Sequence, residues 1–146
     1  MLLILMSALF SSCEDKHYYE VGADMENRFF TVEPHQWKWN AVTERMEAVV
    51  SFDYIDEYIY EHGGAVSAGV YITKIVDGRE IEVLCNLPYL VTDYDRNENE
   101  FYTVNMGFEI SRDNRGKIIF YIQDSSLAEL EIRDDYEFKV TVFWVK

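Results

Sequence analysis

Two pairs of aromatic residues have a spacing that suits a binding surface. Trp37 and Trp39 flank one lysine, and Tyr58 and Tyr60 flank one isoleucine. Side chains two positions apart in a strand lie on the same side of it. If a pair faces solvent, it forms a flat surface for stacking against sugar rings, with Asn40 placed to hydrogen-bond hydroxyl groups, or for anchoring a protein interface. In the alternative interpretation, one tryptophan fills the core and the tyrosines cover an edge.

A second candidate site is a run of acidic and amide side chains. Asp93, Asp95 and Asn97 occupy alternate positions in DYDRNENE, similar to the start of an EF-hand loop. The sixth loop position is Glu98 where a glycine is needed, and the twelfth is Val104 where a bidentate glutamate belongs. The three residues therefore remain only a weak hypothesis for a calcium loop of another kind. A solvated acidic hairpin tip is the alternative.

Catalytic motifs are missing from the sequence. The three histidines lack metal-ligand spacing, and there is no nucleophile elbow and no phosphate-binding glycine loop. Carboxylates are so numerous that no glycosidase pair stands out. We expect a binding protein without cofactor, and not an enzyme. A hydrolase would require two carboxylates with perturbed pKa values to converge in a cleft.

The charge excludes one class of partner. The 146 residues include 27 acidic and 13 basic side chains, for a formal net charge of −14. Such a surface repels nucleic-acid phosphates and anionic lipid headgroups, so we expect no nucleic-acid partner. The length is that of one domain with a proper core.

The N-terminus predicts export. The apolar run Met1–Phe10 is shorter than the roughly 20 residues of a spanning helix, and it has the form of a signal-peptide core. With Ser11, Ser12 and Cys13 it resembles a bacterial lipobox. That resemblance implies a signal peptide over residues 1–12 and a lipid on Cys13, which anchors the protein in a membrane. The alternative is a first strand or helix with Cys13 as an ordinary thiol.

Two further features bear on location and on disulfides. The acidic residues Glu14 and Asp15 resemble the signal that sends Bacteroidota lipoproteins to the outer face of the outer membrane. Cys85 shares its alternation with Ile81 and Val83, which places it on a core face, where cysteine behaves as a small hydrophobe. We therefore expect no disulfide between Cys13 and Cys85.

Alternating apolar residues predict the fold. After a polar tether over residues 13–27, apolar side chains recur at every second position throughout residues 28–146. Clear examples are the sets Met46, Ala48, Val50, Phe52 and Tyr136, Phe138, Val140, Val142. This pattern predicts a single all-β domain, an antiparallel sandwich of six or seven strands. Turns are expected around Gly78 and at 113–116, and a single helical turn or a plain loop around Ser126.

Several phrases resemble a family of small Bacteroidota lipoproteins of uncharacterised function. They are the lipobox-like start, VEPHQWKW at 32–39, IDEYIYEHGGAV at 55–66, LPY at 87–89 and FKVTVFWV at 138–145. The resemblance implies an immunoglobulin-like β-sandwich in the outer membrane, facing the cell exterior, and it supplies no catalytic residues. From these observations we expect a lipid-anchored binding or adhesion module that interacts with a surface protein. A carbohydrate-binding module is the alternative.

Overall fold

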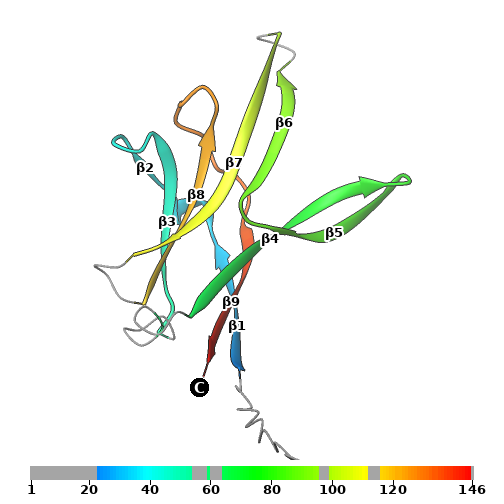
Figure 1. The fold of residues 1–146 in the computed structure, drawn as a ribbon. Coiled ribbons are helices and arrows are strands. Elements are labelled where there is room, and N and C mark those ends of the chain that lie inside the picture. The colour runs from blue at the N-terminus through cyan, green and yellow to red at the C-terminus, as the bar shows by residue number, and fades with distance from the viewer. Residues whose placement is uncertain (1–22, 54–58, 60–63, 96–98, 112–115, 146) are drawn as a thin grey trace, which may run out of the picture.

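A computed structural model describes residues 23–53, 59, 64–95, 99–111 and 116–145. Two antiparallel sheets form the fold (Figure 1). The four-stranded sheet has the order β1-β9-β4-β5, and the five-stranded sheet has the order β2-β3-β8-β7-β6. The strands are β1 (Ala23–Val32), β2 (Lys38–Asn40), β3 (Arg45–Ser51), β4 (Ala65–Val76), β5 (Arg79–Asn86), β6 (Tyr89–Asp95), β7 (Glu100–Ile110), β8 (Lys117–Asp124) and β9 (Tyr136–Val145), with a 3-10 turn η1 (Pro34–Gln36) before β2.

The prediction of an all-β antiparallel sandwich is confirmed, but the strand count of six or seven is wrong. The described residues form nine strands. β2 is only three residues long, and β5 and β6, which lie on either side of Leu87 and Pro88, belong to different sheets. The first strand begins at Ala23, inside the segment 13–27 predicted to be a tether, because Ala23–Asn27 pairs with the end of β9.

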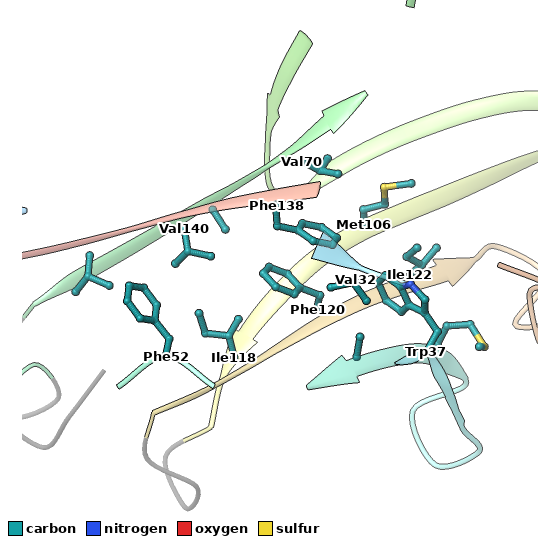
Figure 2. Packing of buried hydrophobic residues seen from close by; sticks show 14 of the residues in the cluster. Val32, Trp37, Phe52, Val70, Met106, Ile118, Phe120, Ile122, Phe138 and Val140 are labelled. Carbon is teal, nitrogen blue, oxygen red and sulfur yellow. The ribbon is translucent and has the colours of Figure 1, made fainter. Parts of the chain in front are cut away.

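The core lies between the two sheets, where the alternating apolar side chains meet (Figure 2). Phe120 of β8 and Phe138 of β9 stack with ring centroids 3.9 Å apart, which joins the five-stranded sheet to the four-stranded sheet. Among the described residues, the largest fully buried side chains are Val32, Val70, Ile118, Phe120, Ile122, Phe138, Val140 and Val142. The faces predicted from the alternation of β3 and β9 are thus faces that pack in the core.

The turns have the expected chemistry. Asp77 and Gly78, which join β4 to β5, both have positive φ angles of 52° and 74°, as a type I′ hairpin requires. Gly116, the last residue of the turn expected at 113–116, has a φ of 73° just before β8, the left-handed conformation that favours glycine. The segment around Ser126 is a loop rather than a helical turn, and Leu127 within it has a φ of 56°.

Candidate functional site

The most unusual feature of the fold is a hairpin that extends beyond the sandwich. β9 pairs with β4 only from Ala65 to Val70, so the remainder of β4 has β5 as its one described partner. We call the segment Tyr71–Leu84 the β4–β5 ribbon. In Figure 1 it leaves the two sheets and ends in a free tip.

Apolar side chains of the β4–β5 ribbon are exposed on both of its faces. Every residue from Thr73 to Glu82 is exposed. Ile75 is 75% exposed and Leu84 43% on one face, while Val76 is 46% and Ile81 40% exposed on the other. An isolated two-stranded hairpin is marginal in water unless a face is covered. A surface that can bury these side chains would therefore stabilise the ribbon.

The root of the ribbon is fixed to the sandwich. Leu84 lies on Gly69 of β4, where a Cβ would approach the leucine Cδ1 to 2.8 Å. Ile72 and Cys85 pack against the core. The ammonium of Lys74 lies 5.2 Å from the ring centroid of Tyr89, and a hydrogen bond with Tyr89 raises the pKa of Lys74. The ribbon is thus held at its base and uncovered at its tip.

The outer strand of the ribbon carries two carboxylates without cationic partners. β5 is the last strand of its sheet. Glu80 and Glu82 lie on one face of β5, opposite Ile75 and Thr73 of β4. No ion pair reaches either glutamate from the described residues. The free edge therefore combines unpaired backbone groups, apolar side chains and uncompensated negative charge.

The tryptophan pair is divided between the core and the surface. Trp37 follows η1, is only 4% exposed and lies among the buried core side chains (Figure 2). Its ring meets Tyr136 edge-on, with the ring centroids 5.9 Å apart. An exposed pair of Trp37 and Trp39 is therefore ruled out, and the alternative in which one tryptophan fills the core is confirmed. Trp39 lies in β2 and is half-buried. Tyr58 and Tyr60 lie outside the described residues.

Trp39 nevertheless lines an open pocket of about 460 Å³. The other lining residues are Gln36, Lys38, Asn40, Ala41, Glu47 and Val49. Asn40 donates through Nδ2 to Glu47 at 2.9 Å, and its Oδ1 accepts from the backbone N–H groups of Val42 and Thr43. The pocket thus offers one aromatic face and a rim of polar groups, of which Asn40 is already engaged in holding the turn.

Beside this pocket, Arg45 joins three strands on the outer face of the five-stranded sheet. Its Nε donates to Glu47 at 2.7 Å, and its two terminal nitrogens donate to the carboxylate of Glu109 on β7 at 2.8 and 2.7 Å. The Arg45 guanidinium also lies over the ring of Tyr121 on β8, 4.2 Å from the ring centroid. Tyr121 in turn lies directly over Gly107 of β7. This cluster fixes β3, β8 and β7 relative to one another.

The two carboxylates of this cluster are held ionised. The hydrogen bond from Arg45 lowers the pKa of Glu109. Partial burial would raise the pKa of Glu47, but hydrogen bonds from Asn40, Arg45 and Thr43 outweigh it and lower the pKa. A general acid needs a raised carboxyl pKa. The pair therefore acts as a structural ion-pair network and gives the hydrolase hypothesis no support.

The remaining candidate residues form no metal or ligand site where the structure describes them. Asp93 and Asp95 lie at the end of β6, and Asn97 falls outside the described residues, as does Cys13. Asp95 pairs with Glu100 at the end of the pairing between β6 and β7. In the part of the chain that the structure describes, no group of three or more His, Cys, Asp or Glu side chains is placed to hold a metal ion. Cys85 is a half-buried free thiol.

Comparison with known proteins gives no match. No protein-family model, no curated protein and no solved structure is similar to this chain at a significant level. Within the described ranges there is also no helix of sufficient length and apolar character to cross a membrane. The interpretation of this protein therefore rests on its own residues and geometry.

Proposed function

We propose that this protein is a lipid-anchored, non-enzymatic binding module of the outer-membrane surface, and that its β4–β5 ribbon binds a protein partner. The observation that supports the proposal most directly is the ten-residue stretch from Thr73 to Glu82, exposed throughout, which bears apolar side chains on both faces. Exposed apolar side chains gathered on one projecting element are typical of protein interaction sites. The fixed root presents the ribbon in a defined orientation, which lowers the entropic cost of binding.

The anchor is the second part of the proposal. The lipobox-like residues Ser11, Ser12 and Cys13 support it. Expression of the full chain in a bacterial host with a fatty-acid analogue tests it directly. Wild type should be labelled and Cys13→Ala should not, whereas equal labelling of both, or of neither, would contradict the anchor.

Site-specific crosslinking on intact cells tests the ribbon. A photoreactive amino acid replaces Ile75 in one variant and Val42 in the control; Val42 is 92% exposed and lies in the turn after β2, away from the ribbon. The proposal predicts a discrete crosslinked protein at position 75 that is absent at position 42. Adding Ile81→Ser should weaken that product. Identical products at both positions, or none at position 75, would refute the ribbon as a binding element.

A second candidate function is carbohydrate binding at the Trp39 pocket. It is favoured by the half-buried indole and the polar rim of Gln36, Lys38 and Asn40 around one opening. Aromatic faces with adjacent polar groups suit the apolar and hydroxylated sides of a sugar ring. Binding on a glycan array that is lost in Trp39→Ala would establish this function, and no binding across a broad array would eliminate it.

A further inference from the structure

We propose that the partner of the β4–β5 ribbon is an extended segment of alternating basic and apolar residues, which adds as a new strand to the free edge of β5. This inference rests on the proposed function, because it names the chemistry of the segment that the ribbon binds. Strand addition to an exposed edge is a general mode of peptide recognition, in which backbone hydrogen bonds give affinity and alternate side chains give specificity.

The backbone of β5 has a free edge along its length. β5 has eight residues, and its pairing with β4 uses one edge only. In the described sheet no strand lies beyond it. The N–H and C=O groups on that side can therefore pair with an incoming strand. The stretch of β5 next to the tip has no sheet behind it, so a third strand there would cover apolar side chains of the ribbon as well.

The side chains of β5 select the chemistry of the incoming strand. Glu80 and Glu82 project from one face, and Ile81 and Val83 from the other. Residues directly opposite each other in adjacent strands lie about 5 Å apart and interact strongly enough to favour opposite charges and apolar pairs. A strand with Lys or Arg opposite both glutamates and Val or Ile opposite Ile81 and Val83 satisfies every one of these positions.

A second copy of this chain is the wrong occupant. Antiparallel pairing of two β5 strands about Ile81 would place Glu80 opposite Glu82, and pairing about Val83 would place Glu82 opposite Leu84. Each arrangement leaves carboxylates without cations, and two chains of net charge −14 repel each other. Charged residues on an edge deter indiscriminate pairing. Here they deter acidic chains and admit a basic one.

The other edge of the four-stranded sheet differs from β5. β1 is the edge strand on the opposite side of the same sheet. Its Glu26 lies 3.6 Å from Arg28 of the same strand, so the negative charge there already has a cation nearby. β1 is also backed by the core along its pairing with β9. Only β5 among these two edges combines free carboxylates with uncovered apolar side chains.

Peptide binding to the full chain tests the proposal. The probe is an eight-residue alternating lysine–valine peptide, the length of β5, and the control is a peptide of the same composition with lysines and valines in separate blocks. The alternating peptide should bind, with amide chemical-shift changes concentrated in residues 79–86. N-methylation of alternate peptide nitrogens on the bonding side should abolish binding, because it removes the donors of the new ladder.

Matched variants of the protein separate this mode from simple charge attraction. Glu80→Gln/Glu82→Gln should weaken binding about fivefold or more and reduce its salt dependence. Asp134→Asn/Asp135→Asn removes the same charge from an exposed loop and should leave affinity within about twofold of wild type. Equal weakening by both double variants, or equal binding of the blocked peptide, would overturn the proposal. So would a dimer in sedimentation analysis that dissociates when β5 is substituted.

Failure here and failure of the proposed function give different results. If crosslinking at Ile75 identifies a partner but the alternating peptide does not bind, the occupant named here is wrong and the ribbon remains the binding element. If position 75 gives no specific product on cells, the ribbon is not the functional surface, whatever the peptide does.

Discussion

Replacement of Gly107 by alanine tests whether Tyr121 and its arginine stabilise the five-stranded sheet. Gly107 lies on the outer face of β7, opposite Tyr121 of β8. A Cβ at this position would lie 2.7 Å from Cε1 of Tyr121 and closer still to Cζ and the hydroxyl. No real Cβ tolerates such contacts. The phenol ring must therefore turn away, and Arg45, which lies 4.2 Å above it, must lose that contact.

The expected loss can be worked from these two contacts. Overpacking that forces a side chain out of place costs about 1–3 kcal/mol. Loss of the cation–π contact between Arg45 and Tyr121 adds about 0.5–1 kcal/mol at an exposed site. Alanine is itself better than glycine in a strand by about 0.5–1 kcal/mol, so we expect Gly107→Ala to lower the free energy of unfolding by about 1–3 kcal/mol in total. For a domain of this size the midpoint of thermal unfolding should fall by roughly 4–12 °C.

Urea denaturation of four proteins decides the matter: wild type, Gly107→Ala, Tyr121→Ala and the double variant. Once the phenol ring is absent, the new methyl group meets no obstacle from it. Glycine is intrinsically poor in a strand, by roughly 0.5–1 kcal/mol relative to alanine. Gly107→Ala should therefore destabilise the wild-type background and slightly stabilise the Tyr121→Ala background. An equal loss in both backgrounds would refute the reasoning, and so would wild-type stability of the single variant.

Two further predictions concern acid stability and the core. The pKa values of Glu47 and Glu109 lie below the ordinary value of 4.5, so the two ionised carboxylates stabilise the folded state. This contribution to the free energy of unfolding is full above pH 4.5 and is lost as the pH falls through the lowered pKa values. In urea titrations from about pH 6 to 3, Arg45→Met should lose less stability on acidification than wild type does. Phe138→Ala should cost about 3–5 kcal/mol and Phe143→Ala less than about 1, measured by the same titrations, because only Phe138 is buried.

The sequence predicted the packed part of the fold well because alternation there is enforced by burial on one face. Phe120, Phe138 and Val140 all face the core as expected. Strand boundaries were harder to predict. Asp24 and Glu26 read as tether residues, since charged side chains carry no core signal, yet their backbone pairs with β9. Backbone hydrogen bonds between strands do not depend on side-chain type, so a polar sequence does not indicate that they form.

The local backbone before β2 explains why Trp37 and Trp39 do not share a face, although their spacing fits one strand. Trp37 and Trp39 would share a face if both were in one strand. The 3-10 turn Pro34–Gln36 has Trp37 as its C-cap residue, so β2 begins only afterwards, at Lys38. Trp37 consequently packs into the core near Tyr136, and Trp39 alone borders the pocket. Pro34 was the available signal for a turn, since proline favours the first position of such a segment.

The exposure of the ribbon depends on a strand more than sixty residues away. Val70 and Ile72 alternate in the same register as Val76, so covered and uncovered residues share one pattern, which only Lys74 interrupts. The difference arises because β9, coming from the far end of the chain, pairs with β4 only as far as Val70. Ile72 still packs against the core, but from Thr73 onward the apolar side chains of the ribbon have no described sheet to pack against. The hydrophobic alternation that builds the core therefore continues past the end of β9. There its apolar side chains form a surface that a partner strand can cover.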